Sequence, residues 1–194
     1  MPPCFNRLAL LIITALLLVG CASTPSISLE KDKTGPIATV ALLRVTESQQ
    51  FIVRNLSKLP VLGGGAIGGT IAGVVEAKRT ETFVDEYNRR SVQLSASLVG
   101  NLQRELNSSG MQISYFPDEF AKLKDGADDY SHIKTDKDAI LSIWFGPVGY
   151  IAKGAIADAP YEPWVVVHVR LLQSKTMQVL SQTTYTAGYK AKQA

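Results

Sequence analysis

The sequence predicts an α+β fold, a single domain in which helices pack on a mixed or antiparallel sheet of about 4–5 strands. Three observations predict it. Short apolar runs rich in β-branched residues recur along the chain, an apolar stripe at helical spacing lies between two of them, and the last two runs flank a polar turn. A glycine-rich apolar segment at residues 59–75 stands apart from this pattern.

The first strand is predicted at residues 37–45, an apolar run with a Gly-Pro pair directly before it. Residues 50–56 alternate too weakly to decide between a second strand and a loop. Residues 111–116 alternate between polar and apolar side chains, which predicts another strand. A helical stretch precedes this strand, so the order is that of a unit whose helix covers a sheet.

Phe83, Val84 and Tyr87 begin an apolar helical face. Further apolar residues follow at helical spacing, and we interpret the stripe as core packing: Val92, Leu94, Leu98, Val99, Leu102 and Leu106. Residues 107–110 stop the helix, and Gly110 is the expected left-handed cap.

Residues 117–137 are charged and rich in turn residues, which predicts a solvated loop with a short helix around Phe120. The ligand spacing of a calcium loop is missing from this stretch. The apolar stretch at residues 138–151 predicts a buried strand, and we expect this strand to end at the Gly146-Pro147 pair within the stretch.

The chain closes with two apolar runs, at residues 164–172 and 177–187, which read as a hairpin around the turn at 173–176. On the first run four apolar side chains share one face while His168 and Arg170 share the other: Val165, Val167, Val169 and Leu171.

Near the amino terminus, Leu18-Val19-Gly20-Cys21 ends an apolar stretch that follows Arg7. The apolar stretch is about 18 Å long as a helix, too short for a hydrocarbon core of about 30 Å. These residues resemble the lipobox of bacterial lipoproteins. The resemblance implies that residues 1–20 are removed and that Cys21 receives a diacylglyceryl group and a further acyl chain such as palmitate, a firm anchor. The alternative is a soluble secreted protein with a free thiol, a liability in an oxidising compartment.

Residues 21–36 are rich in Ser, Thr, Pro and charge and form a flexible tether with a reach of up to roughly 50 Å. Ala22 stands where an Asp favours inner-membrane retention in enteric lipoproteins. The resemblance therefore implies the outer membrane, with the folded domain, residues 37–190, facing the periplasm.

Composition limits the function. The chain has 20 Lys and Arg against 17 Asp and Glu, a net charge of +3, which argues against a nucleic-acid surface. Cys4 is removed with the signal peptide and Cys21 carries lipid, so no disulfide and no thiolate metal site is available. We expect neither a cofactor nor a metal ion.

Gly65, Gly69 and Gly73 recur every four residues in the glycine-rich segment. In a helix they would form a stripe for close helix contact, as in the glycine-zipper segments of some outer-membrane lipoproteins, which the segment resembles. Three interpretations stay open: a helix or loop packed on the domain, a membrane-inserting or self-associating hairpin, and a ligand loop. The third rests on Gly63, Gly65 and Gly68, a GxGxxG match that a glycine-dense stretch produces by chance.

The arrangement also resembles the group that contains the curli-secretion lipoprotein, the outer-membrane activators of penicillin-binding proteins and the N-terminal domain of the Tol-Pal propeller protein. The carrying features are residues 37–44, the helix ending at Gly110, residues 138–141 and the final hairpin. The resemblance implies partner binding without catalysis.

An enzyme would need His132, His168 or the carboxylate pair Asp118 and Glu119, and the sequence holds no HExxH or GxSxG motif. We therefore expect a non-catalytic accessory module that binds envelope proteins, with a homo-oligomer or a membrane-inserting form as the alternative. The expected contact surface is a sheet edge or the aromatic region around Tyr161 and Trp164, although Trp164 fits the core equally well.

Overall fold

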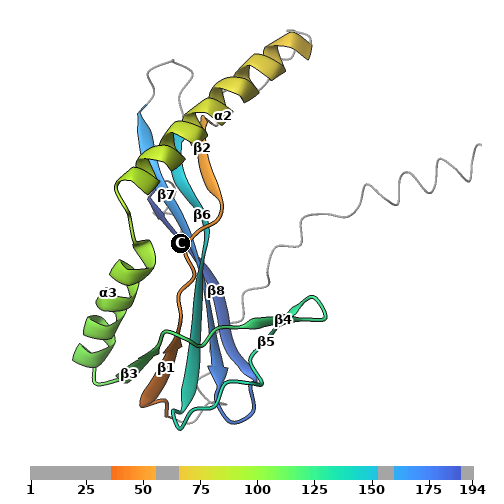
Figure 1. The fold of residues 1–194 in the computed structure, drawn as a ribbon. Helices are drawn as coiled ribbons and strands as arrows, with labels where there is room; N and C mark the ends of the chain where they lie inside the picture. Colours follow the sequence, from red (N-terminus) through yellow and green to blue (C-terminus); the bar gives the residue numbers. More distant parts are fainter. Residues whose placement is uncertain (1–35, 56–65, 153–159, 189–194) are drawn as a thin grey trace, which may run out of the picture.

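The computed structural model describes residues 36–55, 66–152 and 160–188, and for residues 66–74 it describes the backbone alone (Figure 1). The predicted signal peptide, the lipidation site Cys21 and the tether to residue 35 lie outside this part of the chain.

A mixed sheet of six strands forms the domain, which has the predicted α+β class. The strands run in the order β3-β1-β6-β7-β8, and β2 also pairs with β6. Their bounds are Thr39–Leu43 for β1, Phe51–Asn55 for β2, Gln112–Phe116 for β3, Ala139–Ala152 for β6, Tyr161–Gln173 for β7 and Val179–Gly188 for β8. Pairing is parallel between β1 and β3 and antiparallel along β6, β7 and β8.

The long strand β6 has two different parallel neighbours. Its first half pairs with β1, where Val40 lies opposite Ala139, and its second half pairs with β2, where Phe51 lies opposite Val148. Between the two, Thr46 forms an isolated bridge to Trp144. The strand predicted at residues 37–45 is thus confirmed, and the undecided stretch at 50–56 is a strand.

The prediction that this strand ends at Gly146-Pro147 is wrong. Proline has no amide hydrogen to donate, but a bulge accommodates it. Phe145 lies opposite Val167 and Val148 lies opposite Val165, so two residues on β6 oppose one on β7. The Ser48 hydroxyl donates to the Gly146 carbonyl at 2.7 Å. The strand therefore continues, and the extra residue changes which side chains of its second half face the helices.

Two helices join β2 to β3 and lie on the same side of the sheet: α2, Ala66–Arg89, and α3, Leu94–Ser108 (Figure 1). Four residues separate them, and Ser91 takes a positive φ of 48°. Gly110 has a φ of 88°, so the predicted left-handed cap is confirmed. The α3 helix packs on the first half of β6 through a cluster that contains Leu42, Val99 and Ile143.

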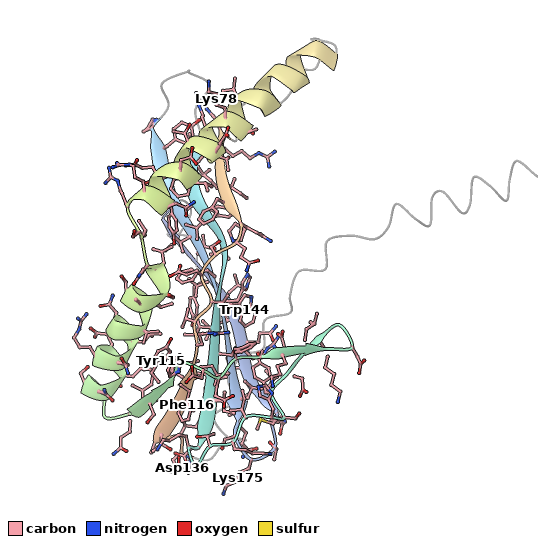
Figure 2. The ribbon with its side chains drawn as sticks, in the orientation of Figure 1. Lys78, Tyr115, Phe116, Asp136, Trp144 and Lys175 are labelled. Carbon is pink, nitrogen blue, oxygen red and sulfur yellow. The ribbon has the colours of Figure 1, made fainter. Side chains whose placement is uncertain are left out.

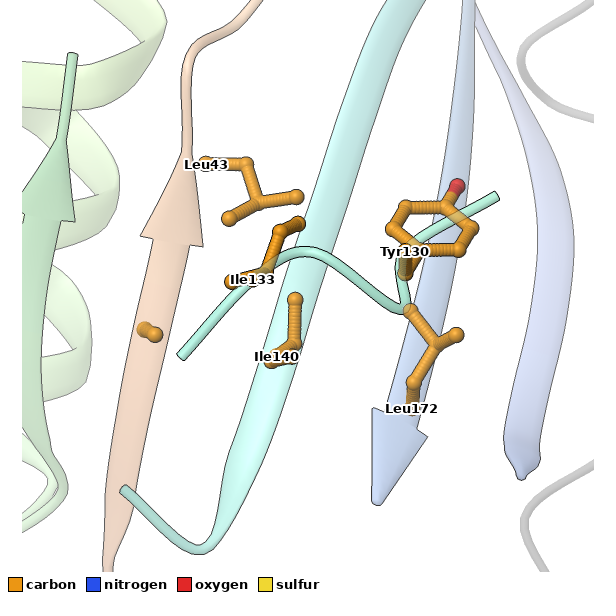
Figure 3. Close-up of a cluster of buried hydrophobic side chains, with 6 residues drawn as sticks. Leu43, Tyr130, Ile133, Ile140 and Leu172 are labelled. Atoms are coloured by element: carbon orange, nitrogen blue, oxygen red, sulfur yellow. The ribbon is translucent and has the colours of Figure 1, made fainter. Parts of the chain in front are cut away.

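The opposite face of this half is covered by the segment between β3 and β6 (Figure 3). Six buried residues form the cluster there: Ala41, Leu43, Tyr130, Ile133, Ile140 and Leu172. The predicted short helix around Phe120 does not form. Instead the segment contains a hairpin of β4, Lys122–Lys124, and β5, Ala127–Asp129, because Asp125 and Gly126 both take the positive φ that a tight hairpin turn requires.

Asp138 fixes the start of β1 by accepting three hydrogen bonds on one carboxylate oxygen. The backbone amides of Ala38 and Thr39 donate at 3.0 and 2.8 Å, and the Thr39 hydroxyl donates at 2.9 Å. The bonds from Thr39, followed by the bond from Ala38, lower the pKa of Asp138 below its ordinary value.

The predicted glycine stripe remains a prediction. Gly65 lies outside the described residues, and Gly69 and Gly73 fall in the first turns of α2, where the backbone alone is described. The amino-terminal part of α2 extends beyond the sheet (Figure 1). Within the described part of the chain, neither helix is both long and apolar enough to cross a membrane.

Candidate binding groove

A groove of about 960 Å³ lies between α2 and the strands β2, β6 and β7. Its aliphatic walls come from Val53, Val75 and Val92, and its aromatic walls from Phe83, Tyr87, Tyr150 and Tyr161. The groove opens to the surface, since 38% of Val75, 37% of Val92 and 38% of Tyr150 is exposed. An apolar concavity of this size is within the usual range for ligand sites.

Helical spacing brings together the α2 residues that line the groove. Val75, Arg79, Phe83 and Tyr87 follow one another at intervals of four residues, so they lie on one face of α2. Thr82, Glu86 and Arg90 flank this face and also line the groove. The same periodicity that predicts core packing therefore produces a lined cavity.

The bulge in β6 supplies the opposite wall. Val165 and Val167 share one face of β7, and direct cross-strand partners share a face, so Val148 lies on the side of the helices. Tyr150, two residues further, shares that face and lines the groove. Without the extra residue at the Gly-Pro pair, strict alternation would turn Tyr150 to the other side of the sheet.

Gly149 lets β2 lie close to this part of β6. A Cβ atom at position 149 would lie 1.7 Å from the carbonyl oxygen of Ile52, a distance that the backbone cannot accommodate without moving. The glycine is therefore required for the spacing between the two strands that form the floor.

Four aromatic rings pack together between β2, β6 and α2. Phe51 lies 5.0 Å from Tyr87 and 5.9 Å from Phe83, measured between ring centroids, and Phe83 meets Tyr150 edge to face at 5.5 Å. These distances are in the favourable range for aromatic pairs. The rings hold α2 on β2 while leaving apolar surface in the groove.

Side chains of α2 also hydrogen-bond the backbone of β2. The Val53 amide donates to the Thr80 hydroxyl at 3.1 Å, and the Asn55 amide donates to Glu76 at 3.2 Å. The helix thus covers backbone donors that would otherwise be available to another strand.

Glu47 lies in the segment between β1 and β2 and links this segment to both helices. The Tyr87 hydroxyl donates to one carboxylate oxygen at 3.1 Å, and the Ser95 amide and hydroxyl donate to the other at 2.8 and 2.6 Å. Burial, and then the negative charge of Glu47, raises the pKa of Tyr87 to about 12. The phenol in the groove wall is therefore neutral at physiological pH.

Three basic residues line the groove: Lys78, Arg79 and Arg90. Arg79 donates to the Tyr161 hydroxyl and lies over its ring, with 5.5 Å between the guanidinium carbon and the ring centroid. Figure 2 labels Lys78 on α2. Within the described ranges no carboxylate forms an ion pair with Lys78 or Arg79.

Arg90 differs because it binds Glu86, which Arg89 also binds. Hydrogen bonds from Arg89 and then Arg90 lower the pKa of Glu86 to about 2, so this carboxylate is ionised. Arg89 does not line the groove, and the charges of the two lining residues Glu86 and Arg90 cancel each other. Among the lining residues, net positive charge therefore comes from the pair at positions 78 and 79.

The residues considered for catalysis lie outside the groove, and of these the structure brings His132 and Glu119 together but leaves His168 in a separate cluster. His132 lies 3.7 Å from Glu119, and a second cluster contains His168, whose ring stacks on Trp144 at 5.3 Å and contacts the Thr184 hydroxyl at 2.9 Å. Burial lowers the pKa of His168. Over the described residues, no three His, Cys, Asp or Glu side chains are placed to hold a metal ion.

His168 and Arg170 share the face of β7 opposite the helices, as the sequence predicts. Arg170 donates to Asp128 at 2.6 Å and to the Tyr130 hydroxyl at 3.0 Å, which ties β7 to the segment that covers this face. The arrangement is structural: the charges of the Arg170 and Asp128 side chains pair with each other.

Of the predicted contact residues, Tyr161 lines the groove and Trp164 does not. Trp164 is half-buried within β7, opposite Gly149 and Gly188 on the neighbouring strands. Sequence reasoning missed the groove itself, because its α2 face has the spacing of an ordinary core face.

No protein-family model matches the chain, and no curated protein does. Among solved structures, a neuraminyllactose-binding hemagglutinin homolog from Helicobacter pylori is similar at 13% identity, covering 86% of this chain and 70% of its own, with a TM-score of 0.37. Protein XCC0632 of the DUF330 family from Xanthomonas campestris has 12% identity, covers 85% and 74%, and has a TM-score of 0.39. Lipoprotein GNA1162 from Neisseria meningitidis has 16% identity, covers 78% and 82%, and has a TM-score of 0.28. These bacterial structures are too distant to transfer the role of any residue.

Proposed function

We propose that this protein is a lipid-anchored lipoprotein of the bacterial outer membrane, that it acts as a non-catalytic accessory module, and that it binds a component of the envelope in the groove beneath α2. The groove is the observation that carries the proposal. It is an open, mostly apolar concavity of about 960 Å³ with aromatic walls and a few charged side chains, the composition expected of a binding site.

The sequence supports the anchor. Cys21 ends a segment that resembles a lipobox, and the residues after it have the composition of a flexible tether. A tether of this kind confines the domain near the membrane and raises its effective concentration toward partners within reach. A module of this kind needs a binding surface rather than a catalytic group.

The groove is tested by photo-crosslinking the full chain in living cells. A photo-crosslinking amino acid replaces Val75, which lines the groove, or Ala77, which is exposed on α2 and lies outside it. We expect a specific envelope component to be captured at position 75 and not at position 77. Equal capture at both positions, or none at position 75, contradicts the proposed site.

The anchor is tested by Cys21→Ala. Without the thiol no diacylglyceryl group is attached, so the variant should accumulate as an unprocessed precursor and lose its acyl chains. Mass spectrometry of the purified protein measures both changes. Normal processing and membrane retention in Cys21→Ala would show that the protein is not a lipoprotein.

A further inference from the structure

We propose that the groove holds an acyl chain of an anionic phospholipid, with the phosphate bound by Lys78 and Arg79. The inference rests on the proposed function in one respect, that the groove is the binding site, and it names the class of molecule that binds there. It follows from three properties of the walls: most of their polar groups already have partners, most of their remaining surface is apolar, and their unpaired charge is positive.

Most polar groups in the walls, apart from the Tyr150 hydroxyl and the Lys78 ammonium, are paired within the described part of the protein. The Thr82 hydroxyl donates to the Lys78 carbonyl at 2.9 Å, the Tyr87 hydroxyl donates to Glu47, and the Tyr161 hydroxyl accepts from Arg79. Glu86 is held by two arginines. An occupant therefore gains little from hydrogen bonds to these side chains and most from apolar contact.

The floor does not favour an extended peptide. A peptide that adds to a sheet relies on free backbone donors along an edge strand. On β2 the amides of Val53 and Asn55 donate to Thr80 and Glu76 on α2, which lies over that edge. An acyl chain needs no such donors, because it binds through burial of methylene groups.

Charge selects the head group. Arg79 donates to the Tyr161 hydroxyl, and in the described part of the chain neither Arg79 nor Lys78 has a carboxylate partner. Lys78 and Arg79 are neighbours in the sequence and both line the groove, and a phosphate at its side would accept charge-assisted hydrogen bonds from both. A cationic amphiphile, or a neutral one without a phosphate, would leave both charges uncompensated.

The openness of the groove favours a phospholipid over a free fatty acid. Val75, Val92 and Tyr150 each remain more than a third exposed, so the groove takes one chain without enclosing the rest of the molecule. A phospholipid has a second chain and a head group that must remain outside. The predicted anchor holds the domain within reach of a bilayer that supplies such molecules.

The experiment uses the full chain in cells grown with radiolabelled inorganic phosphate. A photo-crosslinking amino acid replaces Val75 or, as the matched control for membrane proximity, Ala77. We expect a phosphate-labelled adduct with the mass of a phospholipid at position 75 and at least a fivefold weaker one at position 77.

The charge requirement is tested by adding Lys78→Gln and Arg79→Gln to the position 75 probe. The labelled adduct should fall several-fold, while Lys122→Gln with Lys124→Gln, on the distant strand β4, removes the same charge and leaves the adduct unchanged. Thermal melting of each variant shows that the domain still folds. If Lys78→Gln with Arg79→Gln leaves the amount of labelled adduct unchanged, the assignment of the phosphate site is overturned.

The remaining outcomes separate the two proposals. A protein adduct at position 75, or a lipid adduct without phosphate, overturns the phospholipid and leaves the proposed groove intact. Equal labelling at positions 75 and 77, or no adduct at position 75, overturns both.

Discussion

The two halves of β6 belong to one strand but have different surroundings. In the first half, β1 and β7 flank the strand, α3 covers one face and the segment with Tyr130 and Ile133 covers the other, and Ile140 is fully buried. In the second half, β2 replaces β1, and α2 covers the sheet through aromatic rings that leave a groove. Mostly aliphatic side chains pack on both faces of the first half, whereas the second half keeps an open groove lined by tilted and edge-to-face rings and long basic side chains. We therefore expect stability to depend mainly on the first half and the proposed binding to depend on the second.

The largest effect is expected from Leu43→Ala in the first half. Leu43 is fully buried in the cluster of Figure 3, so the truncation leaves a cavity and should lower the free energy of unfolding by about 2–5 kcal/mol. Urea denaturation measures the loss. If the folded fraction of this variant still captures its partner at position 75, binding depends on the second half alone. If capture by the folded fraction falls together with stability, binding depends on the first half as well, and the two halves do not differ in the way described above.

An intermediate effect is expected from Gly149→Ala in the second half. The new methyl group would overlap the Ile52 carbonyl, so β2 must move away from β6, at a cost of about 1–3 kcal/mol. We expect capture in the groove to fall more than the melting temperature suggests. The matched control is Gly100→Ala, whose Cβ meets no atom within 4 Å and which should stabilise α3 by about 0.5–1 kcal/mol.

The smallest effect is expected from Asp138→Asn, at the start of the first half. The folded-state pKa of Asp138 lies below its ordinary value of 3.8, so the ionised carboxylate stabilises the fold above pH 3.8, and this contribution is lost as the pH falls through the lowered pKa. The wild type should therefore unfold at higher urea concentration than Asp138→Asn at neutral pH, and the two curves should converge in acid. A constant difference at every pH would assign the effect to something other than the charge.

The sequence predicts elements that local pattern determines. The strand at 37–45 is an apolar run, the strand at 111–116 alternates between polar and apolar side chains, and the final hairpin is two apolar runs around a polar turn. Gly110 is a cap because no other residue type takes its φ so readily. These elements need little tertiary information, so their types were predicted correctly.

Features that depend on a neighbouring element were missed. Gly146-Pro147 reads as a strand end, and the strand continues only because β7 accepts a bulge at Val166. The Phe83 and Tyr87 face reads as core, and in the structure it packs on Phe51 of β2 and also lines the groove. Periodicity identifies the buried face of a helix but not the shape of the surface against which that face packs.

The three hydrogen bonds that Asp138 accepts have a mechanical consequence. They clamp the chain where β1 begins, and the groove lies along the other half of β6. Any tension between the residues that precede Ala38 and a molecule held in the groove would therefore run along β1 and into β6. Because β1 lies between two parallel partners, β3 and β6, such a pull loads both ladders in shear, with many bonds resisting together, rather than unzipping them one at a time. The strand nearest the predicted anchor is thus arranged to bear load.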